Sequence, residues 1–84
     1  MQVFPQDIHE IQRAAESSSW KIREEAVKKL KARINEERGF NSRERKIVLQ
    51  LFELLLGDNH AKILGSVRDY EFHLLIFAFF HVIL

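Results

Sequence analysis

Histidines and neighbouring carboxylates are the residues of this 84-residue chain that could bind a metal or transfer protons. His9-Glu10 begins like the zinc-protease motif His-Glu-x-x-His, but Arg13 stands where the second histidine is required. His73 and His81 are eight residues apart, about two helical turns, which is too far for them to share a metal without further ligands. We therefore interpret the histidines as hydrogen-bonded or exposed side chains and expect no metal site.

Other catalytic patterns are also missing from the sequence. It contains no nucleophile elbow, Gly-rich phosphate loop or dinucleotide-binding fingerprint. Carboxylates such as Glu24-Glu25 and Glu36-Glu37 fall on expected solvated helix faces, where an ion pair contributes roughly 0.2–0.5 kcal/mol. We predict that the chain is not an enzyme and that it needs no cofactor.

Trp20 is the strongest candidate for recognition of a partner. It is the only tryptophan, and it stands where Ser17-Ser18-Ser19 meets an amphipathic segment. Two interpretations stay open: Trp20 packs down onto the first helix pair, or it protrudes from a loop tip as an anchor. Tryptophan is enriched among binding hot spots. In the second interpretation Lys21 and Arg23 add steering towards an acidic partner.

Composition limits the partners that the chain can have. Lys and Arg number 13 and Asp and Glu number 12, so the net charge of +1 lacks the clearly basic balance that is typical of nucleic-acid-binding domains. The absence of cysteine excludes disulfides and thiolate zinc sites, so packing must supply the stability. Residues 1–10 lack the features of a secretory signal. We expect no nucleic-acid partner and a cytoplasmic location.

Hydrophobic periodicity predicts four helical segments, of which the first runs from about Pro5 to Glu16. The second runs from Trp20 to about Glu37. Its apolar residues form one stripe at helical spacing: Ile22, Ala26, Val27, Leu30 and Ile34. The third starts near Asn41 or Ser42, both good N-caps. Apolar residues surround most of it, which predicts burial on several sides.

The fourth segment follows the turn signal Gly57-Asp58-Asn59 and runs from His60 to Leu84. We expect a break around Gly65-Ser66, because glycine destabilises a helix interior. The end, Phe72 to Leu84, has eleven apolar residues and two histidines. Its composition also suits a buried strand, an alternative that periodicity leaves open; its helical neighbours favour a helix. It is shorter than the roughly 20 apolar residues of a membrane span, and we expect it to lack part of its natural cover.

The order of these segments resembles the start of a TOG domain, a tubulin-binding module of microtubule regulators built from HEAT repeats. After a short helix and a loop, residues 20–30 (WKIREEAVKKL) match the pattern Trp-x-x-Arg-x-x-Ala-x-x-x-Leu that opens the second helix of the first repeat. The apolar stretch 46–56, followed by 57–63 (GDNHAKI), is similar to the second repeat with its Asp- and Asn-containing loop. The resemblance covers roughly residues 6–75.

This resemblance implies an all-α fold of antiparallel helix pairs stacked as HEAT-like repeats, 5–38 and 41–84, in a single module. TOG domains grip tubulin through the loops inside successive repeats. The resemblance therefore implies tubulin as partner and a cytoskeletal location. Five residues are then expected to bind the partner, with Trp20, Lys21 and Arg23 at the first loop and Asn59 and Lys62 at the second.

A second hypothesis needs no tubulin. The chain would then be a generic helical interaction or dimerisation module, and the apolar C-terminal helix would dock on a partner or form a homo-oligomer through Phe72–Leu84.

Overall fold

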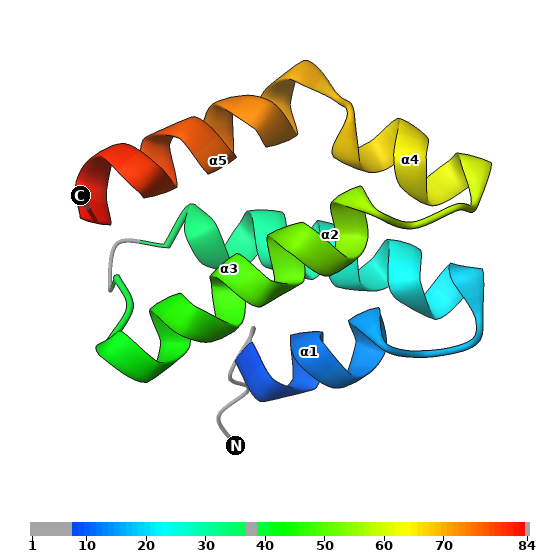
Figure 1. Ribbon diagram of the computed structural model, residues 1–84, viewed down its shortest axis with the longest axis horizontal. Coiled ribbons are helices and arrows are strands. Elements are labelled where there is room, and N and C mark those ends of the chain that lie inside the picture. Colours follow the sequence, from blue (N-terminus) through cyan, green and yellow to red (C-terminus); the bar gives the residue numbers. More distant parts are fainter. Residues whose placement is uncertain (1–7, 37–38, 84) are drawn as a thin grey trace.

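The computed structural model describes residues 8–36 and 39–83, and over these residues the chain is all-helical. The helices are α1 (Ile8–Ala15), α2 (Trp20–Ile34), α3 (Ser42–Leu56), α4 (Ala61–Val67) and α5 (Tyr70–Ile83) (Figure 1). The all-α prediction is therefore confirmed for the described residues, and the C-terminal segment is a helix and not a strand. The expected helix limits at Pro5 and Glu37 lie outside the described residues.

The helices α2 and α3 lie in the middle of the molecule. Helix α1 packs against both of them, while α4 and α5 cover the opposite side and contact α2 (Figure 1). The fold is flat, with extents of 34 × 31 × 19 Å. Both the α1–α2 loop and the α3–α4 loop lie at the right-hand edge in Figure 1, so the chain turns twice at the same edge.

A local capping interaction explains where α3 begins, but α2 begins without one. Asn41 forms a capping box with Glu44: the Asn41 side chain accepts a hydrogen bond from the Glu44 amide at 2.8 Å, and the Glu44 carboxylate accepts one from the Asn41 amide at 2.9 Å. Ser19 occupies the N-cap position of α2 without a side-chain cap. Its amide instead donates to Ser17 Oγ at 3.0 Å, which folds the serine loop back on itself.

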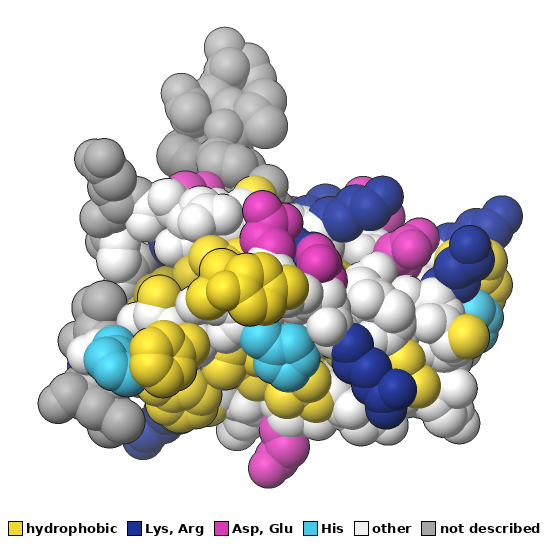
Figure 2. All heavy atoms as spheres, turned by 90° about the horizontal axis from the view of Figure 1, so that it is seen from above, with side chains coloured by type: hydrophobic (Ala, Val, Ile, Leu, Met, Phe, Trp, Pro, Cys, Tyr) yellow, Lys and Arg dark blue, Asp and Glu magenta, His cyan; other side chains and the backbone are white. Residues whose placement is uncertain are grey.

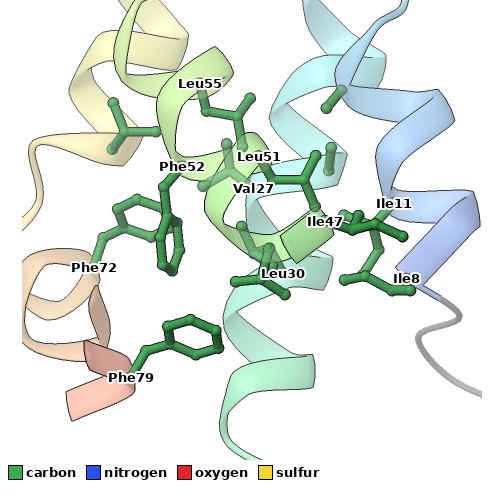
Figure 3. Packing of buried hydrophobic residues seen from close by; sticks show 14 of the residues in the cluster. Ile8, Ile11, Val27, Leu30, Ile47, Leu51, Phe52, Leu55, Phe72 and Phe79 are labelled. Atoms are coloured by element: carbon green, nitrogen blue, oxygen red, sulfur yellow. The ribbon is translucent and has the colours of Figure 1, made fainter. Parts of the chain in front are cut away.

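The apolar core is continuous and α3 runs through it (Figure 3). On one side of α3, Ile47 lies towards Ile8 and Ile11 of α1. On the other side, Phe52 meets the rings of Phe72 and Phe79 of α5 edge-on, with centroids 5.9 and 5.4 Å apart. Helix α3 thus joins the N-terminal and C-terminal parts of the chain into one core.

The break in the last segment lies at Arg68-Asp69, so the prediction of a break at Gly65-Ser66 was wrong. Gly65 lies inside α4 with no neighbouring atoms around the position of a Cβ, so its cost is one of helix propensity alone. Two tertiary contacts lie directly beside the break. Asp69 forms an ion pair with Lys31 of α2 at 3.4 Å, and the chain then turns to bury Phe72 in the core.

One expectation of burial was also wrong. Ile22, which belongs to the apolar stripe of α2, is 48% exposed, and the core side of α2 is made by Ala26, Val27 and Leu30 together with Arg33. Helix α3 is buried against α1, α4 and α5, in line with the predicted burial on several sides, but it leaves Leu49, Leu54 and Leu56 exposed.

Helix α5 is the most apolar helix, and it is only partly covered. It buries Phe72 and Phe79 but leaves Leu74, Phe77 and Phe80 exposed. None of the helices among the described residues has both the length and the apolar character needed to cross a membrane.

Leu30 and Ile22, two side chains of equal size in α2, offer a test of this core. Leu30 is fully buried, so Leu30→Ala should lower the free energy of unfolding by about 2–5 kcal/mol through lost burial and a residual cavity. Ile22→Ala should change it by less than about 1 kcal/mol, because half of that side chain is already exposed. Urea denaturation followed by circular dichroism measures both. Equal losses of unfolding free energy in the two variants would contradict the placement of Leu30 in the core and Ile22 outside it.

Candidate binding edge

The α1–α2 loop and the α3–α4 loop are tied together by one arginine. Arg23, in the first turn of α2, donates from Nε to Asp58 Oδ2 at 2.7 Å. Its Nη1 donates to the carbonyl oxygen of Ser17 at 2.9 Å. Arg23 thus holds one loop by its backbone and the other by a side chain 35 positions further along the chain. We call residues 17–23 and 57–62 the binding edge.

The Asp58 carboxylate is shielded from water and fully engaged. Its side chain is 8% exposed, and that of Arg23 is 17% exposed. Burial alone would raise the pKa of Asp58, but the hydrogen bonds from Arg23 and from the His60 amide, together with the positive charge of Arg23, outweigh it, so the pKa lies below its ordinary value. Asp58 therefore stays ionised and paired near neutral pH.

A second link across the edge is aromatic. The rings of Trp20 and His60 stack with centroids 4.7 Å apart and planes 16° from parallel. Lys21 Nζ lies 5.9 Å from the centre of the Trp20 ring. His60 Nδ1 accepts the Lys62 amide at 3.1 Å, which fixes the His60 ring at the start of α4. Trp20 is half-buried, so it is neither a core residue nor a freely protruding anchor.

A shallow, open depression of about 480 Å³ lies beside the ion pair. Its lining comes from both loops and the helix ends beside them: Ala15, Glu16, Ser17, Arg23, Leu54, Gly57, Asp58 and Asn59. Arg23 and Asp58 neutralise each other there, so neither is free to act as an acid, a base or an ion-binding group. Among residues 8–36 and 39–83, no three His, Asp or Glu side chains are grouped so that they could hold a metal ion. The arrangement suits recognition of a surface by shape and hydrogen bonding.

The structure brings the five sequence-predicted residues to this edge, but not in equivalent roles. Lys21, Asn59 and Lys62 are exposed, and Trp20 presents part of its ring. Arg23 differs from the expected steering charge, because Asp58 and the Ser17 carbonyl already occupy its guanidinium.

Sequence reasoning did not assign a site role to Asp58 or His60. Asp58 was visible only as part of the turn signal 57–59, and nothing near it in the sequence names Arg23 as its partner. His60 follows the same turn, and its stacking on Trp20 depends on how the two loops meet.

Comparisons of the chain with protein-family models, with curated proteins and with solved structures found no match. The role of the binding edge is therefore argued from its own residues and geometry.

The ion pair predicts a pH-dependent contribution to stability. Asp58→Ala should cost about 1–3 kcal/mol at neutral pH, because it leaves the Arg23 guanidinium without its acceptor. The pKa of Asp58 is lower in the folded chain than in the unfolded chain, where it lies near 4. The ion pair therefore contributes its full stabilisation at pH values above about 4. This stabilisation is lost as the pH falls through the lower pKa of the folded chain. The difference between wild type and variant should therefore shrink in acid.

Urea denaturation at a series of pH values measures this difference. Asn59→Ala, an exposed neighbour in the same loop, is the control and should change stability little at any pH. A difference between Asp58→Ala and wild type that stays constant down to strongly acidic pH would show that the carboxylate charge contributes nothing.

Proposed function

We propose that the chain is a non-catalytic protein-binding module of stacked, HEAT-like helix pairs that contacts tubulin through its binding edge. The packing supports the pairing: α1 packs with α2, and these two helices contact the following helices, α1 on α3 and α2 on α4 and α5. Helix pairs stacked in this way leave their connecting loops on the edges of the layer. The resemblance of residues 20–30 to the first repeat of a TOG domain supports tubulin as the partner.

The observation that carries the proposal is the joining of the two loops by Arg23 and Asp58. Without this pair, residues 17–19 and 57–60 would be separate surface loops. With it, exposed residues from both loops form one surface: Lys21 and Trp20 from the first, Asn59 and Lys62 from the second. These are the positions that the resemblance assigns to tubulin contact.

The physics of the edge suits a docking surface for an acidic partner. The stacked rings of Trp20 and His60 form a flat and rigid platform, so little side-chain entropy remains to be lost on binding. Lys21 and Lys62 are exposed on either side of the loop junction, where they can attract a negatively charged surface and hasten its approach. Such attraction should weaken as salt is added.

The proposal predicts loss of tubulin binding when the edge is altered. Lys21→Glu/Lys62→Glu should weaken binding by about tenfold or more, because it replaces attraction by repulsion at an exposed rim. Trp20→Ala should abolish binding by removing the aromatic platform. Size-exclusion co-elution with tubulin and a titration at two salt concentrations measure both effects.

The matched control is Lys28→Glu/Lys29→Glu, which reverses two exposed charges on the same helix, about two turns beyond Lys21. It should bind as wild type does. Circular dichroism checks that each variant is folded. A wild-type chain that does not bind tubulin would refute the partner. Binding that survives both edge variants would refute the edge.

A further inference from the structure

Helices α3 and α5 share an uncovered apolar face that the binding edge does not include. Leu49 and Leu56 of α3 and Phe77 and Phe80 of α5 are exposed, with Phe77 at 62% the most accessible of them. Leu49 and Leu56 are two turns apart and flank Phe52, whose ring lies 6.4 Å from that of Phe80. These four exposed side chains, which we call the end face, lie on the uncovered sides of the two helices.

The end face lies on the outside of the second helix pair. Helix α1 packs on one side of α3, and α2 packs on one side of α4 and α5, so both contacts come from the first pair. Hydrophobic and histidine side chains gather over α5 in Figure 2, in contrast to the basic and acidic side chains at the other end of that view. No described helix covers the end face.

The outer side of the first helix pair, α1 and α2, is mostly charged. Exposed residues of α1 and α2 there include Glu10, Arg13, Glu25, Lys28 and Lys29. A second copy stacked head to tail would bury these charges against phenylalanine and leucine side chains, which is costly. Stacking into open-ended chains is therefore disfavoured. The same end face of a second copy offers apolar surface of matching character.

Charge placement on α3 also fits a second copy. Lys46 and Glu53 are exposed and lie on the same row of the helix as Leu49 and Leu56, and neither takes part in an ion pair among the described residues. A twofold axis that passes α3 between Leu49 and Gln50 sets the two α3 helices antiparallel. Lys46 of each copy then lies opposite Glu53 of the other, which gives two ion pairs around an apolar centre.

We propose that two copies of this chain associate through the end face as a twofold-symmetric dimer, with α3 antiparallel to α3 and α5 against α5. This goes beyond the proposed binding of tubulin, because the end face and the binding edge are different surfaces. It also differs from an interaction by the C-terminal helix alone, since Leu49, Lys46 and Glu53 of α3 set the register.

The first experiment measures mass by light scattering and sedimentation over a range of concentrations. The wild-type chain should reach twice its 10.0 kDa mass. Phe77→Glu should remain a monomer, because it places an unpaired charge in the apolar end face. The matched control is Ile22→Glu, which adds the same charge at an exposed apolar residue of α2 and should leave the dimer intact.

The second experiment tests the register by exchanging charges. Lys46→Glu and Glu53→Lys should each weaken the dimer about tenfold, because each sets like charges opposite one another twice. The double variant Lys46→Glu/Glu53→Lys should restore the wild-type dissociation constant. An equimolar mixture of the two single variants should form a heterodimer, because each Lys–Glu contact is then regained.

Some outcomes would overturn the proposal. A wild-type chain that stays at 10.0 kDa at all concentrations would refute the dimer. Association that tolerates Phe77→Glu would refute the end face. Two single charge variants that dimerise like wild type, or a double variant that stays weak, would refute the antiparallel arrangement of α3. Circular dichroism and thermal unfolding show in each case whether the variant is folded.

Discussion

The ion pair between Arg23 and Asp58 is the interaction on which the binding edge depends. It joins residues that are 35 positions apart, and both side chains are largely removed from water. A charge in such a place is stable only when its partner and its hydrogen bonds are all present. Arg23 meets this condition through Asp58 and the Ser17 carbonyl, and Asp58 through Arg23 and the His60 amide. The positions of the two loops are therefore coupled.

A second arginine, Arg33, holds neighbouring segments in place at the other end of α2. Arg33 is buried, its guanidinium lies 4.1 Å from the centre of the Phe40 ring, and it donates to the Gly39 carbonyl at 2.6 Å. It also lies 3.7 Å from the Glu44 carboxylate, which belongs to the capping box of α3. Helix α2 thus uses an arginine near each end to fix the segments beside it, a role for which the planar, multidentate guanidinium is well suited.

Local sequence signals were sufficient to predict most of the helices. They did not reveal which residues that are far apart in the sequence contact one another. The start of α3, which the sequence limited to Asn41 or Ser42, and the turn at 57–59 are encoded within a few residues. At the break at Arg68-Asp69, Asp69 directly precedes α5, but its contact with Lys31 and the burial of Phe72 involve residues distant in the sequence and could not be predicted. Gly65, the strongest local signal for a break, was misleading because one exposed glycine is tolerated inside a helix.

In the candidate site, too, local features could be predicted from the sequence and contacts between distant residues could not. Trp20 was identifiable from its position after the serine run, but its stacking on His60 was not. Arg23 was recognisable as a basic residue beside Trp20, and only the fold shows that its charge is already used. Buried arginines are rare, so a sequence reader assigns Arg33 to the surface by default.

The break between α4 and α5 also separates two ladders of backbone hydrogen bonds. The α4 ladder closes with the Arg68 amide bonded to the Leu64 carbonyl, and the α5 ladder opens with the His73 amide bonded to the Asp69 carbonyl. Helix α5 can therefore detach as a unit without unwinding α4. Its attachment relies mainly on Phe72 and Phe79, which pack edge-on against Phe52, while Phe79 also meets the ring of Phe40. Amide protons of α5 should thus exchange with solvent in concert and before those of α2 and α3, which makes this helix the first cooperative unit to open.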